Sequence, residues 1–192
     1  MKKGVDIISM SLVLFKGNKE LYAAVNRAGK EDIAIICSTA DQGNNHQKVY
    51  PATYQKDLQV ECLIPVAACD KYGKLTDWST TTEAKYNFRG KDVTAKPVRL
   101  MKGSKTHISG SSVATAIAAG TASLILACSL YALKENEELA RRQRIEHFFT
   151  AMQTEEIRRL GLKYVEPSIV FDQAKIGGKA ETYIKNKFSL IA

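Results

Sequence analysis

The chain has 192 residues, of which 45% are hydrophobic and 25% are charged. This length and apolar content suffice for one globular core and exclude an intrinsically disordered chain. The 28 Lys and Arg against 20 Asp and Glu give a net charge of +8, but the basic residues are scattered in twos and threes, so we expect a basic surface and no nucleic-acid binding.

Short apolar runs in the first half of the chain predict strands buried on both faces. Residues 5–10 and 33–37 are the first two runs, and residues 18–28 between them predict a helix capped by Asn18. A strand, a helix and a strand at this spacing imply neighbouring parallel strands joined by a right-handed crossover. Residues 62–68 predict a third strand, which Pro65 displaces toward an edge or a bulge, and residues 90–95 predict a weaker fourth.

The second half of the chain is dominated by an uncharged stretch, residues 108–133, which follows an aperiodic loop at 97–110. Its length would fit a membrane span. Polar side chains crowd its first half, however, and residues 122–133 are too short to span alone. We therefore expect a buried central helix over 112–133 and no membrane association.

The remainder of the chain is charged and amphipathic. Residues 135–152 and 154–160 predict two helices, the second capped by Thr154, and residues 169–172 predict a short strand. Residues 163–192 have two possible assignments. They are either a linker to a further domain, or the last strand and helix of the same domain.

The four cysteines lie in or beside apolar segments, without a Cys-x-x-Cys pair or a histidine at a zinc-like spacing. We expect buried free thiols, no metal and no cofactor, and therefore a reducing compartment, the cytoplasm. The start resembles the basic region of a signal peptide, but Asp6 interrupts the apolar run that follows, so secretion by this segment is not expected.

The most informative segment runs from Gly110 to Ala116, with the sequence Gly-Ser-Ser-Val-Ala-Thr-Ala. A serine here lies in the first turn of a helix, where unpaired N–H groups and the positive end of the dipole favour negative charge. Attack by a serine on a carbonyl creates an oxyanion that such N–H groups can bind. The alternative is an ordinary helix cap.

Four segments in sequence order carry a resemblance to a family. Residues 5–12 end in Ser-Met-Ser-Leu, and residues 23–43 end in Ser-Thr-Ala-Asp-Gln-Gly. Tyr-Pro-Ala at 50–52 is followed by Pro-Val-Ala-Ala at 65–68 and Asp-Trp-Ser at 77–79, and the serine motif comes last, at 110–120. In this order they resemble the C-terminal part of a subtilisin-like serine protease domain over residues 4–133.

The resemblance implies an α/β fold, a three-layer sandwich with a mostly parallel sheet whose N-terminal portion is missing from this chain. It implies that residues 1–133 are the C-terminal part of the catalytic domain and that residues 134–162 are surface helices that close it. Residues 163–192 are then an extension or linker.

The same resemblance assigns roles in catalysis. Ser112 is implied to be the nucleophile, and its own N–H an oxyanion donor. Asp41 stands where the family has an asparagine donor, and a carboxylate donates only when it is protonated, so Asp41 is either a neutral donor or the cap of a Gly-rich turn.

The walls of the primary specificity pocket are implied to be two short segments. They are Ser11, Leu12 and Val13, and Ser38, Thr39 and Ala40. The family usually has glycine at the positions of Val13 and Ala40, so we expect a preference for small or medium apolar substrate residues.

The acid and the base of this family lie upstream of residue 5, and no matching motif occurs in the chain, where His46, His107 and His147 are the only histidines. Two functions therefore stand. The first is a serine-type endopeptidase of peptide or protein substrates, inactive as this chain alone. The second is a degenerate protease-like module that binds peptides or a partner protein without cleavage.

Overall fold

A computed structural model describes residues 4–43, 47–80, 83–94, 106–133 and 139–171, with residues 182, 186 and 189. Its centre is a parallel four-stranded sheet in the order β1-β2-β3-β4. The strands are β1 (Ile7–Met10), β2 (Ala34–Ser38), β3 (Leu63–Cys69) and β4 (Tyr86–Arg89). In register, Ile35 lies beside Leu63, and Val66 beside Tyr86. The predicted parallel sheet is confirmed.

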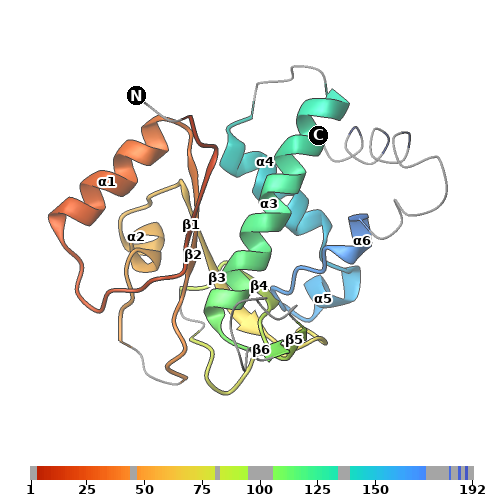
Figure 1. The fold of residues 1–192 in the computed structure, drawn as a ribbon, viewed down its shortest axis with the longest axis horizontal. Coiled ribbons are helices and arrows are strands. Elements are labelled where there is room, and N and C mark those ends of the chain that lie inside the picture. Colours follow the sequence, from red (N-terminus) through yellow and green to blue (C-terminus); the bar gives the residue numbers. More distant parts are fainter. Residues whose placement is uncertain are drawn as a thin grey trace.

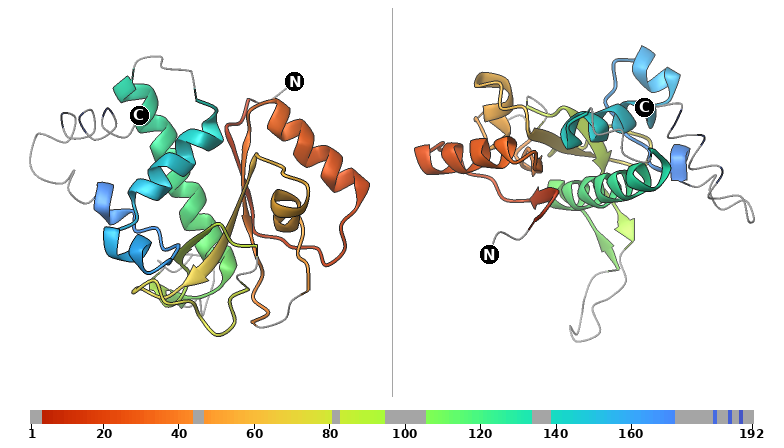
Figure 2. Two further views of the ribbon diagram at one scale, coloured as in Figure 1. Left: turned by 180° about the vertical axis from the view of Figure 1, so that it is seen from behind. Right: turned by 90° about the horizontal axis from the view of Figure 1, so that it is seen from above.

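Helices cover both faces of this sheet, which makes the predicted three-layer α/β sandwich (Figures 1 and 2). One face carries α1 (Lys19–Lys30) and α2 (Ala52–Asp57), and the other carries α3 (Ser111–Leu133) and α4 (Arg141–Ala151). The short helices α5 (Glu155–Arg159) and α6 (Ser168–Phe171) follow, and β5 (Val93–Thr94) pairs antiparallel with β6 (His107–Ile108) in a separate ribbon.

Successive residues of a strand point to opposite faces, and the core divides accordingly. Ile36, Ile64 and Val66 point into a cluster with α3 and α4. Ile35 and Leu63 point into a second cluster, with α1 and α2. The central strands β2 and β3 are therefore buried along their whole length because both faces are covered, as the sequence predicted.

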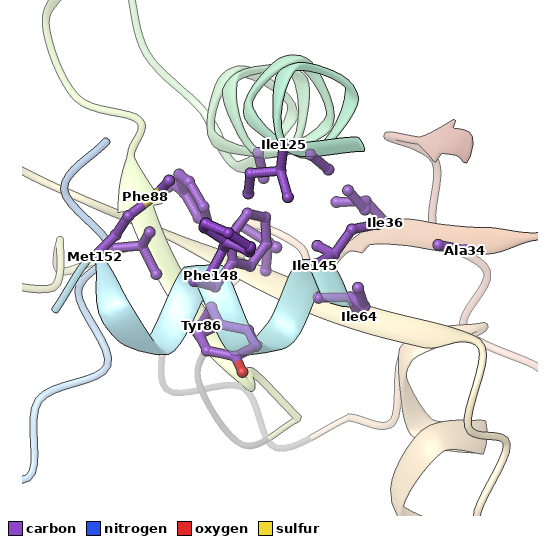
Figure 3. Packing of buried hydrophobic residues seen from close by; sticks show 14 of the residues in the cluster. Ala34, Ile36, Ile64, Tyr86, Phe88, Ile125, Ile145, Phe148 and Met152 are labelled. Atoms are coloured by element: carbon purple, nitrogen blue, oxygen red, sulfur yellow. The ribbon is translucent and has the colours of Figure 1, made fainter. Parts of the chain in front are cut away.

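The cluster beneath α3 is built from small residues on the helix and large residues around it. Ala114, Ala118 and Ala122 are fully buried at a spacing of four residues, which brings the axis of α3 close to the sheet. Figure 3 shows Ile125 of α3 above Phe88 and Phe148, among the aromatic rings of β4 and α4. This packing holds the first turn of α3 in place.

By length and composition alone, the stretch Ser111–Leu130 of α3 is able to cross a membrane. In the fold, however, α3 packs against β1, β2, β3, β4 and α4. The interior of the fold thus accounts for part of this apolar stretch, since 44% of it is buried, while Leu124 and Leu130 are exposed.

The prediction that Pro65 moves β3 to an edge or bulge is wrong, because β3 lies between β2 and β4. Proline is tolerated there because of where its missing N–H would point. The Pro65 carbonyl accepts the Lys85 N–H at 2.9 Å, so the N and O of this residue face the β4 side. Since β4 begins only at Tyr86, no ladder bond is lost.

Other predicted elements also need correction. The fourth strand of the sheet is β4, whereas part of the predicted strand 90–95 forms β5 in the ribbon. Residues 169–171, predicted as part of a last strand, belong to helix α6, which begins after Pro167. Helix α2 was not predicted. The caps Asn18 of α1 and Thr154 of α5 are confirmed, since their side chains accept the N–H groups of Leu21 and Ile157.

Adjacent residues on α3 give a matched test of its packing. Ile125 is fully buried, and Leu124 is 46% exposed. We expect Ile125→Ala to lower the free energy of unfolding by about 2–5 kcal/mol and Leu124→Ala by less than about 1 kcal/mol, measured by urea denaturation. Equal losses for the two variants would show that α3 does not pack on the sheet through this face.

Candidate active site

Ser112 lies in the first turn of α3, beside the segment that follows β1. Its side chain is exposed, and its hydroxyl donates to the Ser11 carbonyl at 3.4 Å, while the Ser11 hydroxyl reaches the Ser112 carbonyl at 3.5 Å. Among the described residues, the Ser112 N–H has no acceptor. One residue thus presents an accessible hydroxyl and an unused helix-terminal N–H, the two groups that a serine nucleophile and its oxyanion contact require.

A pair of buried hydroxyls fixes the residue before Ser112. Ser38, the last residue of β2, donates its hydroxyl proton to the Ser111 oxygen at 2.7 Å. The Ser38 oxygen also accepts the Ala40 N–H at 3.2 Å, and the Thr115 hydroxyl donates to the Ser111 carbonyl at 2.8 Å. These bonds join the end of β2 to the first turn of α3 and satisfy polar groups that water does not reach.

Asp41 meets the same turn from the loop after β2. Both of its carboxylate oxygens accept the Ser111 N–H, at 2.9 and 3.0 Å. Gly110 allows this approach with a φ of +147°, and a Cβ added there would lie 3.4 Å from one of these oxygens. A negative group at a helix N-terminus is favoured by the unpaired N–H groups and the dipole. In this geometry, Asp41 is an acceptor.

The two predicted pocket walls lie at the same end of neighbouring strands. Leu12, after β1, is 55% exposed, and Val13 packs against the cluster that contains Ala40. The Thr39 hydroxyl contacts the carbonyl oxygens of Thr80 at 2.6 Å and Val66 at 3.3 Å. The structure therefore brings one residue of each wall to the first turn of α3: Ser11 contacts Ser112, and Ser38 contacts Ser111.

Ala40 takes a backbone conformation that favours glycine, with a φ of +76°. An L-residue with a Cβ pays about 1–2 kcal/mol in the left-handed region. The Ala40 methyl group is nevertheless buried, at 6% exposure. Ala40 therefore takes a glycine-like backbone conformation, and its methyl group packs into the core cluster with Val25 and Ala52.

One contributor to this site was not predicted. Thr80 lies 41 residues after Thr39, yet its N–H donates to the Ala40 carbonyl and its hydroxyl accepts the Gln42 N–H, both at 3.3 Å. Thr80 thus holds the turn that carries Asp41. No motif marks it, because its role depends on a contact between distant segments.

The histidines do not approach Ser112 in the part of the chain that the structure describes. His107 is exposed on β6, with its Nδ1 3.2 Å from the Thr106 hydroxyl, and lines a pocket with Asp70 and Arg89. His147 is exposed on α4, and His46 lies outside the described residues. The described geometry thus offers the Ser112 hydroxyl and its N–H donor, and neither described histidine forms a hydrogen bond with Ser112.

Thiols and metal-binding clusters are the other reactive groups to consider among the described residues. All four cysteines are free; burial raises the pKa of Cys69 to about 12 and also raises that of Cys37, so these thiols stay protonated and unreactive. The described ranges contain no group of three or more His, Cys, Asp or Glu side chains that could hold a metal ion. Serine is thus the nucleophile that this geometry offers.

The model of the Subtilase family matches residues 1–158. The chain belongs to the subtilase family. It is 28% identical over 92 residues to minor extracellular protease Epr of Bacillus subtilis (strain 168), a match that covers 47% of this chain and 13% of Epr.

Solved structures show the same fold. The prenylagaramide maturation protease PagA matches with a TM-score of 0.63 and 21% identity over 85% of this chain and 60% of its own. A mutant of the protease domain of PatA matches with a TM-score of 0.65 and 21% identity over 96% of this chain and 61% of its own. The chain thus spans less than two thirds of the proteins that it matches.

Removing the Asp41 carboxylate tests whether it stabilises the fold by capping α3. We expect Asp41→Ala to lower the free energy of unfolding by about 1 kcal/mol, because the Ser111 N–H loses its acceptor, and Asp41→Asn to cost less, because an amide oxygen still accepts. Asp77→Ala, also an exposed carboxylate, serves as the control. If urea denaturation gives Asp41→Ala the stability of this control, Asp41 does not cap α3.

Proposed function

We propose that this chain is the nucleophile-bearing part of a serine-type endopeptidase. The Ser112 hydroxyl attacks the carbonyl carbon of the scissile peptide bond, and the Ser112 N–H donates to the oxyanion that forms. The substrate lies along residues 11–13, with its side chain before the cut between the two walls. The observation that carries this proposal is the exposed Ser112 hydroxyl beside an unused N–H at the start of α3.

The reaction also needs a base to accept the Ser112 proton and an acid to orient that base. The proposal places both outside residues 1–192, as the family resemblance implies. It is supported by the share of the related structures that the chain spans, 60% and 61%, which leaves room in such a domain for further residues. The consequence is that residues 1–192 alone do not catalyse peptide hydrolysis.

A second candidate is a module that binds peptides or a partner protein without cleavage. The position of Asp41 favours it, because its carboxylate already occupies the Ser111 N–H at the helix terminus and brings a negative charge to the place where an oxyanion would form. Ser112 would then contact a bound peptide by hydrogen bonds alone.

Both candidates act on a peptide or a protein, with no nucleic acid, membrane or cofactor involved. We place the protein in the cytoplasm, and the four free cysteines support this, because thiols persist in a reducing compartment.

Covalent labelling separates the two candidates. In the longest natural form that contains this chain, we expect a fluorophosphonate to label Ser112 and peptide hydrolysis to fall by more than about 10³-fold in Ser112→Ala, since no other group replaces the nucleophile. Ser109→Ala, also exposed and three residues away, keeps both activities. Residues 1–192 alone should label poorly. Absence of labelling in the longest form supports the binding module, whereas stoichiometric labelling of residues 1–192 alone would mean that they contain their own base.

Asp41→Asn tests the oxyanion side of the proposal in the same longest form. The amide supplies a permanent N–H donor, so we expect kcat at neutral pH to rise while KM changes little. Removing one such donor from subtilisin costs about 10²–10³-fold in kcat, and the gain should stay below that figure. A kcat ratio near one would show that Asp41 does not face the oxyanion.

A further inference from the structure

A further pocket is lined by the loop that leads into α1, by α1 itself and by α2 and the residues before it. Figure 1 shows α1 and α2 on the same side of the sheet. Its volume is about 490 Å³, within the range of sites that hold small ligands or a few peptide residues. Tyr22, Tyr50 and Tyr54 line it, and Phe15 stands beside them, 44% exposed. No group of the proposed catalytic reaction lies in this pocket.

The tyrosines form one packed unit. The ring of Tyr54 meets that of Tyr22 edge-on, with centroids 5.4 Å apart, and that of Tyr50 at 4.9 Å. The Tyr54 hydroxyl donates to the Asn18 carbonyl at 3.0 Å and accepts the Asn18 N–H at 3.1 Å. A Cβ added to Gly17 would lie 2.9 Å from both Tyr50 and Tyr54, so the loop passes directly over the rings. The pocket is thus preorganised, which lowers the entropy cost of binding.

The charges at this pocket are basic. Lys16 and Lys19 line it, both are exposed, and neither has an ion-pair partner among the described residues. Lys48 also lines it but is paired with Asp57. Two uncompensated ammonium groups beside a wall of aromatic rings favour a ligand that combines negative charge with an aromatic group.

The position of the pocket connects it to the predicted peptide site. Leu14, next to the wall residues 11–13, forms a two-way backbone bridge with Tyr50, with N–H to O distances of 3.0 and 2.8 Å. One side of this bridge therefore leads to the walls near Ser112, and the residues that follow it, Phe15 to Gly17, line the pocket. Along the chain, the pocket residues 15–17 thus follow directly after the wall residues 11–13 and the Leu14–Tyr50 bridge.

We propose that this pocket binds an acidic peptide segment that carries an aromatic side chain, as a recognition site separate from the chemistry at Ser112. The aromatic side chain packs against the partly exposed Tyr22, Tyr50 and Phe15, and the carboxylates lie beside Lys16 and Lys19. The inference rests on the proposed function only in taking the ligand to be a peptide, and it holds whether or not the peptide is cleaved.

The test is direct binding to the 192-residue chain, measured by fluorescence anisotropy. The probe is a fluorescein-labelled peptide Glu-Glu-Phe-Glu-Glu, compared with Lys-Lys-Phe-Lys-Lys and Glu-Glu-Ala-Glu-Glu. We expect the first peptide to bind at least tenfold more tightly than the other two, and more weakly as salt screens the charges. Lys16→Glu with Lys19→Glu should weaken its binding at least tenfold, and Phe15→Ala at least threefold.

The matched control reverses two other exposed lysines, Lys30 and Lys74, to glutamate, which changes the net charge equally outside this pocket. The control and Ser112→Ala should bind within twofold of the unchanged chain. Equal binding of the three peptides, an equal loss in the control, or equal competition by a ten-nucleotide thymidine strand would overturn the proposal. Failure of Ser112 to label in the longest form leaves these measurements unaffected, so the two proposals fail separately.

Discussion

The position of the candidate site depends on the packing of α3 against the sheet. Ala114, Ala118 and Ala122 leave little side-chain volume between the helix and the strands, so the helix axis lies close to β1–β4. Because interiors are packed at nearly crystalline density, a larger side chain at these positions would push the helix away. Any such shift would carry Ser112 with it. The composition that makes α3 resemble a membrane span is therefore what places the serine at the end of the strands.

A second constraint acts at the start of the same helix, where packing alone would leave the first turn free to adjust. The Ser38 hydroxyl and the Asp41 carboxylate bind side chain and backbone of Ser111 respectively. Two different groups on one short segment thus define the position of the residue before Ser112. Stability and chemistry oppose each other here, because the carboxylate that best caps a helix is a poor neighbour for an oxyanion. Asp41 does not accept the Ser112 N–H, so this donor remains available to an oxyanion.

What the sequence predicted was mostly local or carried by ordered motifs. The caps at Asn18 and Thr154 followed from a side chain and an N–H three residues away. The family and the sheet followed from four motifs in order. The element β4 was missed because its sequence, Tyr-Asn-Phe-Arg, shows no apolar run and is defined by pairing with β3 and with Tyr164. The bonds of Ser38 to Ser111 and of Thr39 to Thr80 span 73 and 41 residues, and such contacts leave no periodicity in the sequence.

Peptide binding and peptide cleavage draw on different parts of this fold. Binding would use the segment after β1, the loop to α1 and the tyrosines, all of which are held by described contacts such as the Leu14–Tyr50 bridge. Cleavage would use Ser112 and groups outside the described residues. Loss of a base or an acid would therefore abolish cleavage, while the contacts just named, which lie within the described residues, remain. Few residue changes would therefore separate a binding-only subtilase module from an active protease. Asp41 is one candidate for such a change, because its carboxylate lies beside the N–H groups at the start of α3.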